Sequence, residues 1–177
     1  MSEKTEGSRG TSLILEIVIL LTALAAVVVL RLYFFQSSEV ISRSMQPAFN
    51  VGDRFIYLRT QGEYRPQRGD IVSIQYDDTL MTGEELVKRV VGLPGEEIGI
   101  YSGRVYINGK KLDEPYIKEP MTGDSVAYRI PEKMIFVMGD NRNNSEDSRV
   151  WGPMPVASVL GCAKLAFWPL SRFRILR

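Results

Sequence analysis

The longest apolar segment of the chain runs from residue 13 to residue 35, with the sequence LILEIVILLTALAAVVVLRLYFF. As a helix, these 23 residues would be about 35 Å long, enough to cross a hydrocarbon core of about 30 Å. Glu16 and Arg31 lie near its two ends, where charged side chains reach the lipid headgroups at modest cost. Between them, Thr22 is the one polar residue. The pattern predicts a transmembrane helix over residues 13–35.

Two other interpretations of this segment compete with a transmembrane helix. A cleaved signal peptide has a shorter apolar region followed by small residues, whereas bulky residues, 32–35, follow the run here. A core helix of a soluble protein would show a polar stripe along one face, and none is visible. The positive-inside rule gives little guidance on orientation, because two basic residues precede the run (Lys4 and Arg9) and two follow it (Arg31 and Arg43).

After residue 35 the pattern changes to short β-branched segments separated by turn residues. Strands are predicted over 70–76, 85–92, 133–140 and 159–170, and Asn108-Gly109 predicts a hairpin within 103–112. No second long helical period is present. Residues 97–131 are richer in glycine, proline and charge. The expected fold is a mainly β body formed by 36–96 and 132–177, with a small β insertion at 97–131.

Composition narrows the possible chemistry. The chain has no histidine, which excludes a Ser-His-Asp triad and a histidine-ligated zinc site. Its single cysteine, Cys162, excludes an intramolecular disulfide and a cysteine-rich metal site. The net charge of +1 gives no reason to expect a nucleic-acid partner. We expect no metal and no cofactor, and any base acting near neutral pH must be Lys, Asp, Glu or Tyr with a shifted pKa.

Ser44 and Lys88 are the candidates for such chemistry. Ser44 follows the apolar segment in SRSMQPAF, where an ordinary turn serine is the simpler interpretation. In LVKRVV, the strand period of two places Lys88 and Arg89 on opposite faces, so at least one of them lies among aliphatic side chains. An edge strand with solvated cations is the alternative. Burial lowers the pKa of a lysine, and a neutral amine can deprotonate a serine hydroxyl.

A third polar segment, GDNRNNSEDSRVWGPMP, covers residues 139–155 directly after a predicted strand. It could be a solvated surface loop. Its opposite charges could also lock the loop through paired hydrogen bonds around Ser145; these are Asp140, Arg142, Asp147 and Arg149. In that case the Ser145 hydroxyl could orient a neutral lysine nitrogen.

Together these segments resemble the type I signal peptidases of bacteria, which are membrane-anchored Ser/Lys proteases. SRSMQPAF (42–49) resembles the nucleophile motif, VGDRFI (51–56) the next motif, KRVVGLPGE (88–96) the lysine motif and 139–155 the last motif. Their order agrees with the family, an anchor precedes them, and the resemblance covers about 13–170. Ala48-Phe49 and Glu96 depart from the residues frequent in the family, which affects pocket details.

The resemblance implies a role for each matching residue. Ser44 is the expected nucleophile and Lys88 the expected general base. The Ser44 backbone N–H and the Ser42 hydroxyl form the expected oxyanion hole, and Met45 lines the expected substrate pocket. The supporting residues are Ser145, which bonds to Lys88; Asp147 and Arg149, which form an ion pair; and Asp140 and Arg142, which shape the loop.

The resemblance also implies a function. The expected activity is removal of N-terminal signal peptides from exported preproteins, after Ala-x-Ala-like sites, through an acyl-enzyme. The expected partners are those signal peptides, the lipid bilayer and the protein-export machinery. The body would face the extracytoplasmic side, with 1–12 as a cytoplasmic tail. Two alternatives remain: a membrane-anchored binding or scaffold protein with an inactive peptidase fold, and a related Ser/Lys autoprotease.

Overall fold

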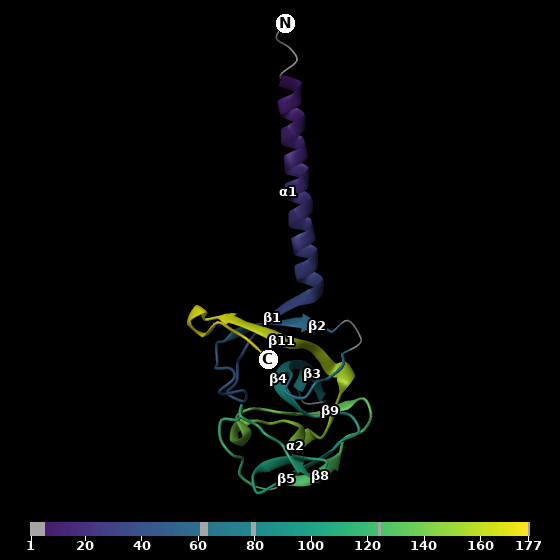
Figure 1. The fold of residues 1–177 in the computed structure, drawn as a ribbon, viewed down its shortest axis with the longest axis vertical. Helices are drawn as coiled ribbons and strands as arrows, with labels where there is room; N and C mark the ends of the chain where they lie inside the picture. The colour runs from purple at the N-terminus through teal and green to yellow at the C-terminus, as the bar shows by residue number, and fades with distance from the viewer. Residues whose placement is uncertain (1–5, 61–63, 79–80, 124, 177) are drawn as a thin grey trace. The chain divides into compact units, whose positions relative to one another are not determined.

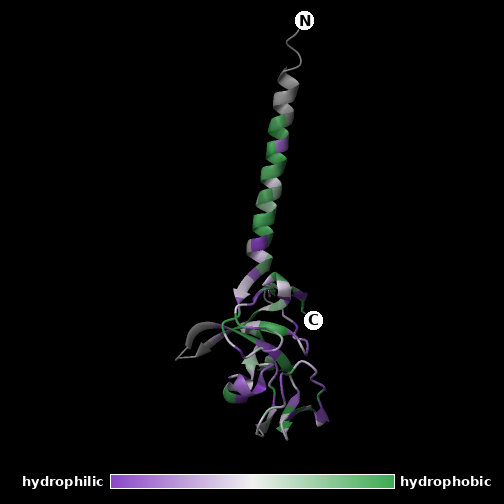
Figure 2. Cartoon of the chain, turned by 90° about the vertical axis from the view of Figure 1, so that its left-hand side faces the viewer, coloured by the Kyte–Doolittle hydropathy of each residue, from purple (hydrophilic) through white to green (hydrophobic). Residues whose placement is uncertain are grey.

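The N-terminal part of the chain is one long apolar helix. The structure, a computed structural model, describes residues 6–60, 64–78, 81–123 and 125–176. Helix α1 spans Glu6–Phe34, so it begins seven residues before the apolar run and ends one residue before it does. Its stretch Leu13–Arg31 is exposed throughout, with a mean hydropathy of 3.0 (Figure 2). By length and composition this stretch suffices to cross a membrane.

The remaining residues, from Ser37 onward, form a separate compact body built on β-sheets (Figure 1). The main sheet has the order β1-β2-β11-β3-β4-β9-β10, and β12 pairs with β11. The bounds are β1 (Phe35–Glu39), β2 (Arg54–Arg59), β3 (Ile71–Asp78), β4 (Met81–Gly92), β9 (Met134–Met138), β10 (Met154–Pro155), β11 (Val159–Trp168) and β12 (Arg174–Ile175). This confirms the predicted mainly β body with an N-terminal apolar helix.

A second sheet is formed by residues 97–129, in the order β7-β6-β5-β8. Its strands are β5 (Glu97–Tyr101), β6 (Arg104–Ile107), β7 (Lys110–Lys111) and β8 (Ser125–Arg129). Asn108 and Gly109 form the two-residue turn between β6 and β7, with φ angles of 49° and 76°. Both angles are positive, as a type I′ hairpin turn requires, which is why Asn-Gly predicts this hairpin.

The second sheet shares a hydrophobic core with two strands of the main sheet. Ile98 and Ile100 from β5 pack in one buried cluster with Val91 from β4 and with Phe136 and Met138 from β9. The inserted region therefore shares its core with the strand that carries Lys88 and with the strand that leads into the polar loop. The assignment of 97–131 as a small β region inserted between the two parts of the catalytic core stays a prediction.

The remaining elements of the body are short. The 3₁₀ turns are η1 (Arg142–Asn144), η2 (Val156–Ser158) and η3 (Leu170–Arg172), and α2 is a single turn over Ser148–Trp151. Asp147 caps α2, since its side chain accepts a hydrogen bond from the Arg149 N–H. Both η1 and α2 fall within the polar segment 139–155, which thereby has a defined backbone along much of its length.

Candidate active site

Ser44 lies in a tight turn between β1 and β2. The Gln46 N–H donates to the Arg43 carbonyl at 3.2 Å, and the Phe49 N–H donates to the Met45 carbonyl at 2.8 Å. The side chains of Met45 and Phe49 are fully buried in a cluster with Phe55 from β2. These contacts hold the turn against the sheet, so that Ser44 itself is only 7% exposed.

Asp53 fixes the end of the same turn, a role that the sequence patterns did not reveal. Its buried carboxylate accepts from the Asn50 N–H at 3.0 Å and from the Arg172 guanidinium at 2.6 and 2.9 Å. Its backbone carbonyl accepts from the Val40 N–H at 2.8 Å. Asp53 therefore joins both ends of the turn that carries Ser44 to the C-terminal segment. The one feature of the sequence that could have pointed to Asp53 is its position within the motif VGDRFI.

Lys88 approaches Ser44 from β4. The distance from Lys88 Nζ to Ser44 Oγ is 3.0 Å, and Lys88 is 4% exposed. Arg89 is 5% exposed, so the prediction that at least one of these cations is buried is confirmed. Burial lowers the pKa of Lys88 from its ordinary value, because the ammonium form loses solvation; the negative charge of Asp147 partly opposes this. Among the described residues, no carboxylate forms a salt bridge with Lys88.

Ser42 lies on the solvent side of Ser44. The two hydroxyl oxygens are 3.0 Å apart, and Ser42 is exposed. A hydroxyl in this position can donate either to Ser44 Oγ or to a group bound beside it. Its placement is compatible with the oxyanion role expected for it, which stays a prediction.

The loop after β9 brings Ser145, Asp147 and Arg149 together. The buried Asp147 carboxylate accepts from Ser145 Oγ at 2.8 Å, from the Gly139 N–H at 2.9 Å and from two nitrogens of Arg149 at 2.7 and 2.8 Å. Arg149 and Asp147 thus form a bidentate ion pair. Within the described part of the chain, Ser145 and Lys88 are not joined by a hydrogen bond, so that contact stays a prediction.

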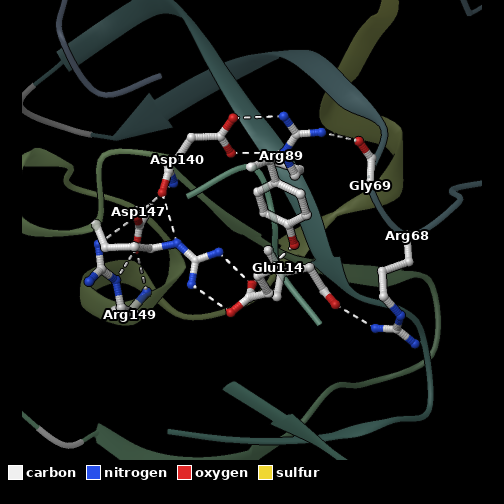
Figure 3. Close-up of polar contacts among 11 residues, drawn as sticks. Arg68, Gly69, Arg89, Glu114, Asp140, Asp147 and Arg149 are labelled. Carbon is white, nitrogen blue, oxygen red and sulfur yellow. Dashed lines mark hydrogen bonds and ion pairs between the residues drawn. The ribbon is translucent and has the colours of Figure 1, made fainter. Parts of the chain in front are cut away.

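Asp140 and Arg142 each form an ion pair with a residue outside this loop, and Figure 3 shows the pair of Asp140 with Arg89. Asp140 accepts two hydrogen bonds from Arg89 on β4, at 2.7 and 2.8 Å. Arg142 donates to Glu114, at 2.6 and 3.2 Å, in the connection between β7 and β8. The sequence did not single out Glu114, because its partner lies 28 residues away and no periodic pattern links the two.

Gly139 lies directly against the turn that carries Ser44. A Cβ atom built on Gly139 would lie 2.3 Å from Ser145 Oγ and 2.5 Å from the Ser44 carbonyl oxygen. Only glycine fits without displacing backbone, which explains the glycine that opens the last motif. Met45 is 1% exposed and offers little surface to a ligand here, so its substrate-binding role stays a prediction.

Comparisons with known proteins assign the family. The family model described as signal peptidase, peptidase S26, matches residues 13–168. A probable signal peptidase I-2 of Synechocystis sp. is 37% identical, over 89% of this chain and 74% of its own length. The signal peptidase I of Bacillus licheniformis is 34% identical, over 98% of both chains.

The chain belongs to the signal peptidase family, peptidase S26. It is therefore a serine peptidase that removes signal peptides. A crystal structure of a signal peptidase I from Enterococcus faecalis V583 shares 35% identity with the chain, covers 56% of it and 97% of its own length, and has a TM-score of 0.49. Among the described residues, no group of three or more His, Cys, Asp and Glu side chains is placed to hold a metal ion.

Proposed function

We propose that the chain is a membrane-anchored Ser/Lys endopeptidase in which Ser44 is the nucleophile and Lys88 the general base. The observation that carries this proposal is the 3.0 Å distance between Lys88 Nζ and Ser44 Oγ inside a buried site. The same distance serves both protonation states of the lysine. An ammonium donates to Oγ, whereas a neutral amine accepts the Ser44 proton.

The first half of the reaction forms an ester. Neutral Lys88 takes the proton of Ser44 as Oγ attacks the scissile carbonyl carbon, which produces a tetrahedral intermediate. The Lys88 ammonium then protonates the leaving amine, and the C–N bond breaks. In the second half, water attacks the ester carbonyl carbon while Lys88 accepts a proton from that water. The bond between the acyl carbon and Ser44 Oγ then breaks, and Lys88 returns the proton to Oγ, which regenerates Ser44.

The oxyanion of the intermediate needs two donors that exist before the reaction begins. We assign these to the Ser44 N–H and the Ser42 hydroxyl. In the described part of the chain, the Ser44 carbonyl accepts a backbone hydrogen bond from the Asn141 N–H, whereas the Ser44 N–H donates no such bond. The free N–H supports this assignment.

Ser145, Asp147 and Arg149 serve to orient the lysine nitrogen. Ser145 Oγ donates its one proton to Asp147. The lone pairs of Ser145 Oγ can then accept a hydrogen bond from Lys88 Nζ. An N–H of Lys88 held in this way directs the nitrogen lone pair toward Ser44. The Arg149 ion pair holds the Asp147 carboxylate in the position where it accepts the Ser145 proton.

The substrates are signal peptides of exported preproteins, cut after Ala-x-Ala-like sites. Because the apolar part of such a peptide lies in the bilayer, an enzyme anchored by α1 meets it at the membrane surface. We propose that the body faces the extracytoplasmic side, near the export machinery, with residues 1–12 as a cytoplasmic tail.

The test uses the full chain in detergent with a fluorogenic peptide that contains an Ala-x-Ala site. Wild type should cleave after the second alanine, with a rate that rises with pH as Lys88 loses its proton. Ser44→Ala and Lys88→Met should each abolish cleavage while the circular dichroism spectrum stays that of the wild type. Binding without cleavage by the wild type would favour a scaffold, and cleavage confined to its own chain would favour an autoprotease.

A further inference from the structure

The connection between β7 and β8 brings a short segment, Glu114–Lys118, against the loop that supports the proposed catalytic pair (Figure 3). This segment lies outside every motif identified in the sequence. We propose that Glu114 is a positioning residue for Ser44 and Lys88, and that it acts through Arg142. The inference deepens the proposed function and rests on it, because it takes Ser44 as nucleophile and Lys88 as base.

The Glu114–Arg142 pair is almost completely shielded from water. The side chain of Arg142 is 0% exposed and that of Glu114 is 6% exposed. Two hydrogen bonds join them, at 2.6 and 3.2 Å. A guanidinium cannot release its proton in a protein, so this buried cation depends on its carboxylate partner. Glu114 is the acidic residue that forms a salt bridge with Arg142 among the described residues.

Arg142 in turn holds the peptide unit against which the nucleophile turn packs. Its Nε donates to the Gly139 carbonyl at 3.0 Å. The neighbouring Asn141 N–H donates to the Ser44 carbonyl at 2.9 Å, and Asn141 Nδ2 donates to the Arg43 carbonyl at 3.1 Å. Gly139 has no space around its Cα on the side of Ser44. A displacement of the Arg142 guanidinium is therefore transmitted to the backbone of Ser44.

The same segment also reaches the residue next to Lys88. The Tyr116 hydroxyl donates to Glu114 at 3.1 Å, and its ring lies 4.1 Å from the guanidinium carbon of Arg89. The Lys118 N–H donates to the Asp140 carbonyl at 3.0 Å, while Arg89 pairs with the Asp140 carboxylate. The segment thus contacts β4 and the loop after β9 at positions adjacent to Lys88 and Gly139. It braces β4, which carries Lys88, and the loop after β9, which hydrogen-bonds to the Ser44 carbonyl.

Loss of the Glu114 charge should misalign the pair without changing any group that touches the substrate. Arg142 would be left buried with a neutral partner, and it would gain free energy by moving toward water. The Gly139 carbonyl would then lose the hydrogen bond that it accepts from Arg142 Nε. A misplacement of about 1 Å at a reacting atom costs about 100-fold in rate.

The decisive variant is Glu114→Gln in the full chain, assayed with the Ala-x-Ala peptide in detergent. We expect kcat to fall by about 10- to 100-fold with KM within about twofold of wild type. Glu114→Asp, which keeps the charge, should recover part of kcat. The matched control is Glu119→Gln, because Glu119 lies in the same connection and accepts from Asn143 at 3.1 Å but is exposed and forms no salt bridge within the described part of the chain. This control should match wild type.

A double variant separates positioning from simple charge burial. Glu114→Gln with Arg142→Gln removes both charges, so the free energy of unfolding should recover toward wild type. If Arg142 positions Gly139, kcat of the double variant stays low, and this supports the proposal. Recovery of kcat together with stability, or wild-type kcat in Glu114→Gln, would overturn it. Absence of Ser44-dependent cleavage in the wild type would instead overturn the proposed function, and this proposal with it.

Discussion

Burial of Lys88 has opposite consequences for folding and for chemistry. An amine held at 4% exposure loses the solvation of its charged form, which lowers its pKa and increases the fraction of free amine, the form that the proposed general base requires. The same desolvation destabilises the folded protein wherever the unfolded chain carries the ammonium. In the window between the lowered pKa and the ordinary value of 10.5, the unfolded state binds more protons than the folded state. The contribution of Lys88 to stability therefore rises with pH across that window.

Lys88→Met should accordingly be inactive but more stable than wild type at neutral pH. Methionine keeps the length of the side chain and has no charge to desolvate. The gain in the free energy of unfolding should shrink as the pH rises toward 10.5, because wild type then loses its penalty. Urea unfolding at several pH values measures this. A gain that does not depend on pH would contradict the assignment of a lowered pKa to Lys88.

Ser42 provides a second test at the residue scale. Loss of one oxyanion donor typically costs about 3–4 kcal/mol of transition-state stabilisation. Ser42→Ala should therefore lower kcat by about 10²- to 10³-fold with little change in KM, as measured in the peptide assay. Ser42→Thr keeps the hydroxyl at an exposed position and should retain much of the activity. Equal loss in both variants would argue against a hydrogen-bonding role.

Among the elements of the body, the loop after β9 packs its backbone closely against the turn that carries Ser44. Gly139→Ala places a methyl group 2.5 Å from the Ser44 carbonyl oxygen, and this backbone atom cannot rotate away. Overpacking of this kind costs about 1–3 kcal/mol of stability. We expect kcat to fall about 100-fold as the turn shifts. Thermal unfolding together with the peptide assay checks both effects, and unchanged kcat would show that the turn tolerates the shift.

Glu146 in the same loop should tune the base without supporting the fold. Its carboxylate is exposed, and its negative charge raises the pKa of Lys88. Glu146→Gln removes that charge, so the ammonium becomes less favourable and the acid limb of the pH–kcat/KM profile should move to lower pH. The shift should shrink as salt is added, because exposed charges are screened. Movement to higher pH would contradict this electrostatic picture.

For the whole molecule, the buried clusters suggest that the body does not need α1 in order to fold. Their members run from Val40 to Ala166, and none belongs to α1. A variant that starts at Phe35 should remain folded and cleave the soluble peptide with a kcat close to that of wild type. It should process a preprotein in vesicles more slowly, because the anchor raises the local concentration of enzyme at the bilayer. Loss of peptide cleavage by a folded truncated variant would show that α1 contributes to the site itself.

Prediction from sequence succeeded where a local pattern has one physical solution. The apolar run containing residues 13–31 predicted a membrane-length helix, and Asn108-Gly109 predicted its hairpin. Other strands, such as β2, were not predicted as strands, and β10 and β12 have only two residues each. Such short elements carry too few residues for a periodic pattern, since long-range pairing forms them. Strand β11 ends at Trp168 rather than at 170, because Pro169 has no N–H for the ladder.

The sequence by itself determined the chemical inventory: an apolar helix, a β body without histidine, and a serine and a lysine available for catalysis. It also determined the order of the motifs, because residue types and their spacing are local properties. Only the tertiary structure decided which groups meet. Ser44 and Lys88 lie 44 positions apart in the sequence, and Glu114 and Arg142 lie 28 positions apart. Strand pairing and core packing bring each pair together, and no local pattern encodes their contact. Burial is a collective property of the packed chain, and it is the main cause that lowers the pKa of Lys88.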